Sequence, residues 1–211
     1  MNKTTVDRNW NERYLAGDTP WAAHGLLTAV IDLIKVSCPN EASIFEIGCG
    51  YGQEAIALAK LGFNVTAVDL SSAAINQAKI NSQEKNVNIH FEAFDLLHDK
   101  NHFSPVDLVL DIAVLHTIEN EATRLKFTQA VFSLLKPGAT WINVSCLSPD
   151  VFKISETTGV KAPPALSKTE LQEMSKNNFF IQKQIVTSYE ISRDGKLVEF
   201  PALISVMKKF P

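Results

Sequence analysis

EIGCGYGQE, residues 46–54, places three glycines at alternate positions directly after a short apolar run. A glycine lacks the Cβ atom that would hold a backbone away from a ligand, and it tolerates positive φ where a strand turns into a helix. In open α/β sheets, ligands bind beside the carboxyl end of such a strand. The stretch therefore predicts a loop for a dinucleotide, a phosphate group or another nucleotide-like ligand, with a flexible turn as the simpler alternative.

Outward from this loop, short apolar runs alternate with longer helical patterns, which is typical of βαβ units and a parallel sheet. The predicted strands are 43–48, 64–69, 87–91, 106–115 and 139–145, with helices at 26–36, 53–60, from 71 or 72, and from 119. A helix over 169–176 precedes an antiparallel pair, 179–187 and 202–207, joined by a hairpin turn at Asp194-Gly195. We predict an α/β fold, a Rossmann-like three-layer sandwich on a mostly parallel seven-stranded sheet with an antiparallel C-terminal strand.

Composition excludes several classes of protein. With 45% hydrophobic residues the chain can form a full core, and its net charge of −3 gives no reason to expect a nucleic-acid partner. Its three cysteines contain no CxxC pair and its histidines show no ligand spacing, so we expect no metal site and a reducing environment. The N-terminus is polar and no apolar run approaches the ~18 residues of a membrane span. We therefore expect a cytoplasmic protein that does not contact membranes.

The spacing of the glycines argues against the commonest nucleotide loops. The NAD(P) fingerprint GxGxxG is matched by Gly48 and Gly50, but position 53, where the third glycine belongs, is Gln. A phosphate-binding GK[ST] sequence is absent as well. Glu46 stands two residues before the first glycine, where its carboxylate disfavours a pyrophosphate and favours a ligand with an ammonium group.

Two further carboxylates follow neighbouring predicted strands. Asp69 ends the second strand, where a carboxylate can accept hydrogen bonds from both ribose hydroxyls. Phe94-Asp95 follows the third strand, where the carboxylate could meet an adenine amino group. Together with the glycine loop, these residues predict a pocket for an adenosine that carries an amino-acid tail and no phosphates.

At this point the chain resembles a known family. EIGCGYGQEAIALAKLGFNVTAVDLS is similar to the cofactor motif of class I S-adenosylmethionine-dependent methyltransferases. FEAFDLL, DLVLDIAVLHTI and LLKPGATWINVS resemble the later motifs of that family, in the same order, so the resemblance covers about residues 43–145. The N-terminal WNERYLAGDTPW resembles the arm of the thiopurine, tellurite-resistance and halide/thiol methyltransferases.

The resemblance implies S-adenosyl-L-methionine as the cofactor and assigns a role to each matching position. The residues implied to bind the cofactor are Gly48, Gly50 and Gly52 at the methionine part, Glu46 at the ammonium group or the loop, Asp69 at the ribose, and Asp95 with Phe94 at the adenine. Leu70 is also implied to bind the cofactor, and Asp111 and Ile112 to lie beside the cofactor at the end of the fourth strand. It also divides a single domain, 1–211, into an N-terminal arm and helix that act as a lid (1–42), a cofactor-binding core (43–146), and a C-terminal loop, helix and closing strands (147–211). Residues 153–165, rich in proline at their end, are expected to form a loop over one end of the sheet.

Aromatic residues of the arm are candidates for the site because a sulfonium is a cation, and cations are attracted to aromatic faces. Tyr14 and Trp21 are therefore expected near the cofactor, although they could simply pin the arm to the sheet. Arg13 is a candidate for the cofactor carboxylate. His116 follows the fourth strand on the substrate side and is the candidate catalytic residue, with a structural histidine as the alternative.

The reaction expected from these residues is methyl transfer to a small-molecule acceptor. A thiolate or another soft nucleophile needs no general base, and the sequence offers no strong base beyond His116. The [DNS]PP[YF] tetrad of enzymes that methylate amino groups of nucleic acids is missing, since the matching place reads Asp111-Ile-Ala-Val. Two alternatives stay open: a non-catalytic S-adenosylmethionine-binding sensor or scaffold, and an NAD(P)-dependent oxidoreductase.

Overall fold

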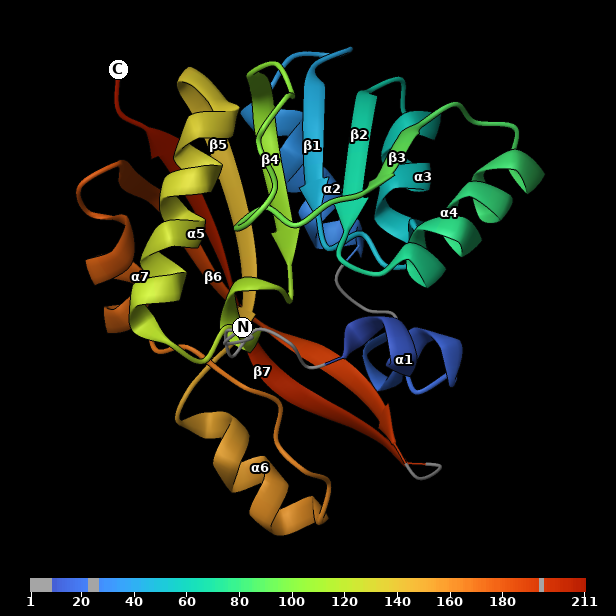
Figure 1. The fold of residues 1–211 in the computed structure, drawn as a ribbon. Coiled ribbons are helices and arrows are strands. Elements are labelled where there is room, and N and C mark those ends of the chain that lie inside the picture. Colours follow the sequence, from blue (N-terminus) through green and yellow to red (C-terminus); the bar gives the residue numbers. More distant parts are fainter. Residues whose placement is uncertain (1–8, 23–26, 194–195) are drawn as a thin grey trace.

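A computed structural model describes residues 9–22, 27–193 and 196–211 and arranges them around one seven-stranded sheet (Figure 1). The strand order is β3-β2-β1-β4-β5-β7-β6, in which β1 to β5 are parallel and β7 and β6 are each antiparallel to their neighbours. The predicted α/β sandwich with a mostly parallel sheet is confirmed. The strands are β1 (Ser43–Ile47), β2 (Asn64–Asp69), β3 (His90–Ala93), β4 (Val106–Ile112), β5 (Leu135–Cys146), β6 (Phe179–Arg193) and β7 (Lys196–Lys209).

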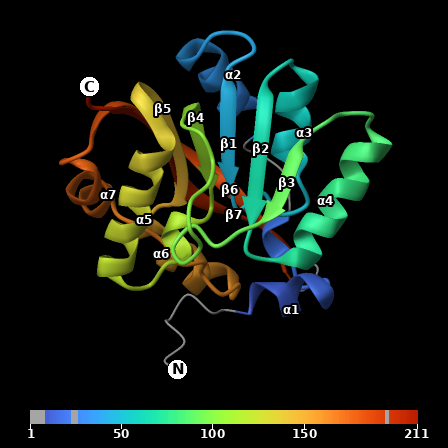
Figure 2. The same ribbon diagram turned by 45° about the horizontal axis from the view of Figure 1, so that its top comes forward.

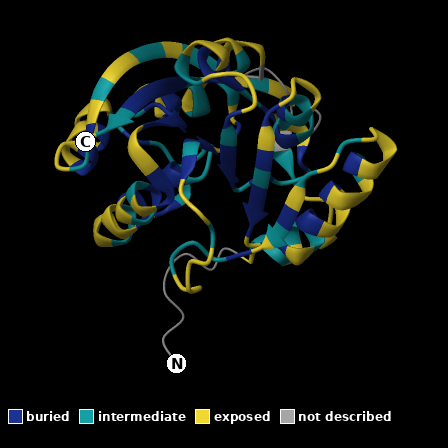
Figure 3. Cartoon of the chain, turned by 90° about the horizontal axis from the view of Figure 1, so that it is seen from above, coloured by how far each residue is buried: buried dark blue, intermediate teal, exposed yellow. Residues whose placement is uncertain are grey.

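Helices cover both faces of this sheet, which gives the three layers (Figure 2). One core cluster joins residues of α2, α3 and α4 to the sheet, and the other joins residues of α5 and α7 to its opposite face. Seen from above, the strands are mostly buried and the outer faces of the helices are exposed (Figure 3). The helices are α1 (Trp10–Leu15), η1 (Pro20–Ala22), α2 (Leu27–Ser37), α3 (Gln53–Lys60), α4 (Ser72–Glu84), η2 (Leu115–Thr117), α5 (Glu121–Leu134), α6 (Asp150–Thr158) and α7 (Lys168–Ser175).

Local sequence explains where these elements begin and end. The run VDLVLDI of β4 lies mostly buried at the centre of the sheet, as its continuous apolar character predicts for a strand covered on both faces. Ser71 caps α4 by accepting the backbone N–H of Ala74, and Asn120 caps α5 by accepting that of Thr123. The capping serine is thus Ser71 and not Ser72.

Some predicted boundaries are wrong. β3 covers His90–Ala93 instead of 87–91, because Asn86 adopts a positive φ of 53° and the chain is still leaving α4 at that point. β4 ends at Ile112 and not at residue 115, because Ala113 turns the chain with a φ of 62°. The antiparallel strands and β5 are longer than predicted, and the predicted hairpin turn at 194–195 and the first residue of the predicted helix 26–36 lie outside the described residues.

The predicted loop 153–165 is also partly wrong, because its first half belongs to the helix α6, Asp150–Thr158. Its prolines stand only at 163 and 164, and Gly159 ends the helix with a φ of 71°. The remaining loop runs over the carboxyl ends of the parallel strands, where α1, α6 and the outer half of the β6–β7 hairpin also gather (Figure 1).

Candidate functional site

The carboxyl ends of β1, β2 and β4 border a cavity of about 610 Å³, within the roughly 300–1,000 Å³ typical of small-molecule sites. Segments far apart in the sequence form its walls. They are the arm (defined here as residues 10–22), the glycine loop (47–54), the ends of β2 (68–70) and β3 (94–97), the segment after β4 (112–118), the loop after α6 (161–164), and two residues of β6, Tyr189 and Ile191.

The three glycines of the loop all have positive φ, of 70°, 53° and 77°, but they meet different neighbours. A Cβ on Gly48 would lie 2.2 Å from Cγ2 of Val114, and one on Gly50 would lie 2.9 Å from the Tyr14 hydroxyl. Gly52 packs against Phe91 and does not line the cavity. The backbone conformation and the packing of protein side chains require glycine at this position, and its predicted approach to the ligand stays a prediction.

Asp69 holds the glycine loop in place. Its Oδ2 accepts the backbone N–H of Gly50 at 2.9 Å, and its Oδ1 accepts that of Ser71 at 2.8 Å. Burial raises the pKa of this carboxyl group, while the two N–H donors pull it back. Asp69 and its neighbour Leu70 both line the cavity, so the predicted ribose contact is compatible with their position and stays a prediction.

Glu46 lines the cavity from the end of β1 and is almost completely buried. Burial raises its pKa well above the ordinary range, and Glu54 and Asp69 add to the rise, whereas a backbone hydrogen bond from Ala55 lowers it. Its Oε2 has no hydrogen-bond partner among the described residues. A buried carboxylate oxygen without a partner is costly, and an ammonium group in the cavity would supply the missing donor and charge.

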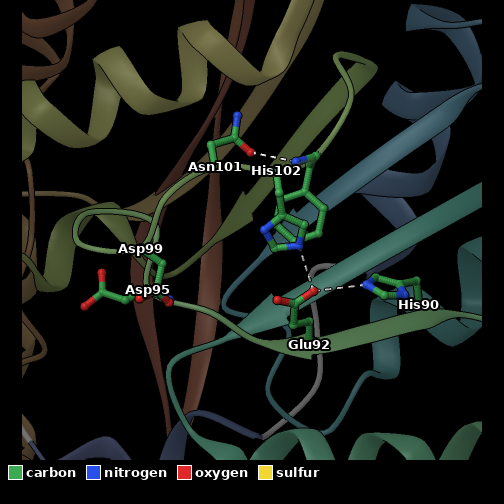
Figure 4. A network of polar contacts seen from close by, with 7 residues as sticks. His90, Glu92, Asp95, Asp99, Asn101 and His102 are labelled. Atoms are coloured by element: carbon green, nitrogen blue, oxygen red, sulfur yellow. Dashed lines mark hydrogen bonds and ion pairs between the residues drawn. The ribbon is translucent and has the colours of Figure 1, made fainter.

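Asp95 lines the cavity just after β3, but its carboxylate already has partners. Oδ1 accepts the backbone N–H of Leu97 at 2.8 Å, and Oδ2 lies 2.8 Å from Nδ1 of His98. Beside it, one oxygen of Glu92 contacts a ring nitrogen of both His90 and His102, each at 3.2 Å (Figure 4). The predicted adenine contact of Asp95 therefore stays a prediction, made by a carboxylate that is already held in a turn.

Phe94 and Ile112 line the cavity as apolar surfaces. Phe94 is also a core residue and packs edge-on against Phe103, so this side chain belongs both to the core and to the cavity wall. Ile112 is half-buried at the end of β4, next to the turn that begins at Ala113. Their predicted contacts with a cofactor are thus compatible with the geometry and stay predictions.

The Asp111 side chain is fully buried and is not among the residues that line the cavity, so its predicted place beside the cofactor stays a prediction. Its carboxylate accepts hydrogen bonds from Asn143 Nδ2 at 2.8 Å and from the backbone N–H groups of Val114 and Leu115 at 3.1 and 3.4 Å. Burial raises its pKa to about 7, against the lowering effect of these donors. Asp111 therefore organises the turn after β4 through these hydrogen bonds.

The arm brings a cluster of aromatic residues to the cavity. Tyr14 and Trp21 both line it, and the Trp21 indole N–H donates to the Tyr14 hydroxyl at 3.3 Å. The guanidinium of Arg13 lies 4.2 Å from the centre of the Trp21 ring and is paired with Asp18 at 2.8 Å. Tyr14 also packs edge-on against Tyr51 of the glycine loop. These arm residues are thus both pins and cavity walls.

Two anchors of the arm escaped the sequence reasoning. Oδ1 of Asn11 accepts hydrogen bonds from the hydroxyl groups of Ser71 and Ser72 at 3.0 and 3.2 Å and from the backbone N–H of Ala73 at 3.0 Å. The Tyr189 hydroxyl donates to the backbone carbonyl of Trp21 at 2.8 Å. No local pattern around Asn11 or Tyr189 indicates these contacts, because their partners lie 60 or more residues away.

His116 lines the cavity from η2 and is 3% exposed. Its Nδ1 accepts the backbone N–H of Cys146, at the end of β5, at 3.2 Å. A neutral imidazole that accepts at Nδ1 carries its proton on Nε2. The structure thus brings the candidate catalytic residue to the cavity and also fixes which nitrogen holds the proton.

The wall around and beyond His116 is more apolar than the glycine loop. It includes Ile118, Phe127 and residues of the loop after α6 and of β6, and the charged member of these segments is Lys161. Among the described residues, no group of three or more His, Cys, Asp or Glu could hold a metal ion. The described helices include none long and apolar enough to cross a membrane.

Residues 44–138 match the family model described as a methyltransferase domain. This match shows that residues 44–138 of the 211-residue chain are similar to methyltransferase domains. A ubiquinone biosynthesis O-methyltransferase of Xanthomonas campestris pv. campestris is 29% identical over 119 residues, which are 56% of this chain and 48% of that relative. The chain thus spans about half the length of that relative.

Solved structures share the fold over nearly the whole chain. A structure from work on the conversion of a disulfide bond into a thioacetal group during echinomycin biosynthesis has a TM-score of 0.74 at 23% identity, over 90% of this chain and 85% of that one. The N-methyltransferase NodS from Bradyrhizobium japonicum, in complex with S-adenosyl-L-homocysteine, has a TM-score of 0.69 at 18% identity, over 95% and 97%. S-adenosylmethionine is the cofactor of the family, and the family match leaves the NAD(P)-dependent alternative without support.

Proposed function

We propose that this chain transfers the methyl group of S-adenosylmethionine to a small-molecule acceptor, with a thiol or another soft nucleophile favoured. The observation that carries the proposal is the buried Oε2 of Glu46, which has no hydrogen-bond partner among the described residues. Glu46 and Asp69 line the same cavity. A ligand that carries an ammonium group and a ribose would supply a hydrogen-bond donor for Glu46 and reach Asp69. The residues present therefore fit the family's cofactor.

In this proposal Glu46 binds the ammonium group and Asp69, with Leu70, borders the ribose. Asp95 and Phe94 face the adenine, and Ile112 contacts the cofactor from β4. The bound cofactor supplies an activated methyl group whose leaving group needs no protonation. The protein aligns the acceptor with that methyl group and excludes water, which are the main contributions expected for such a displacement.

The arm supplies the lid in this proposal. Tyr14 and Trp21 present aromatic surfaces to the cavity, where a sulfonium would be attracted to them. Arg13 also lines the cavity, although its guanidinium is already paired with Asp18, so a contact with the cofactor carboxylate would require it to share that charge. The anchoring through Asn11 and Tyr189 would keep the lid closed over a bound cofactor.

A soft acceptor is supported by the nature of the wall that surrounds His116. Apolar side chains there desolvate a nucleophile, and a thiolate loses less hydration energy than a small hard anion does. The structural neighbour from echinomycin biosynthesis, which concerns sulfur chemistry, agrees with this preference. The lack of nucleic-acid and membrane partners, the cytoplasmic location and the single-domain organisation stay predictions from the sequence.

Calorimetry with S-adenosylhomocysteine tests the cofactor site directly. We expect micromolar binding, and Asp69→Asn should weaken it at least tenfold, since a lost charged hydrogen bond costs about 1.5–3 kcal/mol. Asp32→Asn is the matched control, because Asp32 is exposed on α2 and does not line the cavity. No binding by the wild type would end the proposal, and equal affinity of the Asp69 variant would remove Asp69 from the ribose.

Turnover separates an enzyme from a non-catalytic binder. The assay measures S-adenosylhomocysteine formed from S-adenosylmethionine with a panel of thiols, amines, phenols and carboxylates, and with transfer RNA as a separate arm. We expect product with small thiols and none with RNA. Tight binding without turnover on any acceptor would make the chain a sensor or scaffold, and turnover on RNA alone would move the acceptor to another class.

A further inference from the structure

His116 is held so that it cannot accept a proton from an acceptor in the cavity. The backbone N–H of Cys146 points at Nδ1 at 3.2 Å, in a buried part of the sheet. A backbone N–H is always a donor, so Nδ1 must be the acceptor and the neutral ring must carry its proton on Nε2. Flipping the ring would place a carbon against this N–H and leave a buried donor without an acceptor.

A general base must have an unprotonated nitrogen within reach of the acceptor's proton. If Nε2 of His116 served as that nitrogen while Nδ1 stayed unprotonated, the ring would have to be an imidazolate. If Nδ1 were protonated instead, its N–H would face the N–H of Cys146. Both states conflict with the observed contact, so the ring can donate a hydrogen bond from Nε2 but cannot remove a proton.

The carboxylates that line the cavity have other roles. Asp18 is paired with Arg13, Asp69 holds the backbone of the glycine loop, and Asp95 is held by Leu97 and His98. The remaining pair, Glu46 and Glu54, lies at the glycine loop, on the side that the proposed function assigns to the ammonium group of the cofactor.

Two of the three phenol groups on the cavity wall, those of Tyr14 and Tyr189, are no better as bases, and the third, Tyr51, belongs to the glycine loop on the side assigned to the cofactor. Burial raises the pKa of both Tyr14 and Tyr189, which keeps them protonated, and each hydroxyl is already hydrogen-bonded to Trp21. Among the described residues of the cavity wall, the cations are Arg13 and Lys161, and Lys161 stands in the loop after α6 on the apolar side. This side of the cavity thus combines an N–H donor, a cation and apolar surface.

We propose that the acceptor is a group already ionised in solution, such as a thiolate or a carboxylate, and that His116 serves it as a hydrogen-bond donor through Nε2. The inference rests on the proposed methyltransferase function. A lone pair of the ionised acceptor forms the new bond to the methyl carbon while the carbon–sulfur bond of the sulfonium breaks. The electron pair of that bond stays on the thioether sulfur, and no proton moves.

The first test reads the tautomer of His116 without any turnover. Nitrogen-15 NMR of the histidine-labelled chain, with and without S-adenosylhomocysteine, reports which ring nitrogen is protonated, and His116→Gln identifies the resonance among the five histidines. We expect the Nε2–H form of His116 at pH 8. An Nδ1–H form, which would leave Nε2 as a base, would overturn the proposal.

The second test compares ionised and neutral molecules of the same shape. With S-adenosylhomocysteine saturating at pH 8, benzoate should bind at least tenfold more tightly than benzamide, and thiophenol, which is more acidic than phenol, should exceed phenol likewise. Lys161→Met should reduce this preference, whereas Lys153→Met, on the exposed face of α6, should not. Equal or weaker binding of the anions, or no binding of either anion, would contradict an ionised acceptor.

The two failures can be told apart. If the chain does not bind S-adenosylhomocysteine at all, the proposed function is wrong, and the complex on which the anions are compared does not form. If S-adenosylhomocysteine binds but the neutral molecules are preferred, or Nε2 is unprotonated, the methyltransferase function stands and the ionised acceptor is wrong.

Discussion

Replacing Gly48 by alanine tests whether the glycine loop is shaped by protein packing. Gly48 has a φ of 70°, where an L-residue costs about 1–2 kcal/mol. The new Cβ would also lie 2.2 Å from Cγ2 of Val114, and relieving such an overlap in a packed region typically costs about 1–3 kcal/mol. Gly48→Ala should therefore lower the free energy of unfolding by about 2–5 kcal/mol.

Urea unfolding of Gly48→Ala, Val114→Ala, the combination of the two, and Gly138→Ala separates the conformational contribution from the packing contribution. Gly138 has a similar φ of 72° and nothing within 4 Å of an added Cβ, so Gly138→Ala should cost only the conformational part, about 1–2 kcal/mol. Combining Gly48→Ala with Val114→Ala removes the overlapping methyl groups and should recover about 1–3 kcal/mol relative to additivity. Equal costs at the two glycines, or strict additivity in the double variant, would refute the packing argument.

Three further substitutions test groups around the sheet. Lys136 and Ser43 lower the pKa of Asp107 to about 2. The stability that this ionised carboxylate contributes is therefore present above about pH 4 and is lost as the pH falls through 2. Because Asp107 is partly exposed, Asp107→Asn should lower the free energy of unfolding by only about 1 kcal/mol, read from acid unfolding midpoints. Burial raises the pKa of Asp111 to about 7. The free energy of unfolding should therefore fall by up to about 1.4 kcal/mol per pH unit as the pH rises from about 4 to about 7. Asp111→Asn should flatten this slope in urea titrations, and an unchanged slope would assign it to another group. Asn11→Ala removes three hydrogen bonds between the arm and α4 and should speed hydrogen exchange of residues 10–22 without changing that of β1; equal exchange rates would show that other contacts hold the arm.

The sheet and the position of the loop could be predicted because their causes are local. Alternating apolar runs and helical patterns fix which segments are strands, and a glycine-rich turn after the first of them places the ligand site. Boundaries failed where one residue decides the backbone, as at Asn86 and Ala113, which both adopt positive φ without being glycine. The helix α6 was missed because two prolines at its far side made the whole stretch look irregular.

The site was predicted less completely than the fold, because its contacts join residues that lie far apart in the sequence. Asp69 and Glu46 are carboxylates at strand ends, so their spacing alone placed them at the cavity. Asp111 has the same sequence character and is nevertheless buried below the turn, held by Asn143 of the next strand. No pattern near Asp111 distinguishes a carboxylate that faces a ligand from one that supports the loop.

The glycine loop and the arm form one unit, which changes the meaning of the glycine spacing. The space left by the missing Cβ of Gly50 is bordered by the hydroxyl of Tyr14, and the backbone N–H of the same glycine is held by Asp69. Asp69 also holds Ser71, and the Ser71 hydroxyl donates to Asn11 of the arm. The contacts thus run in a closed ring from the arm through the loop and the end of β2 back to the arm. In the proposed function, a ligand that moves the backbone at Gly50 would therefore also act on the arm through these contacts.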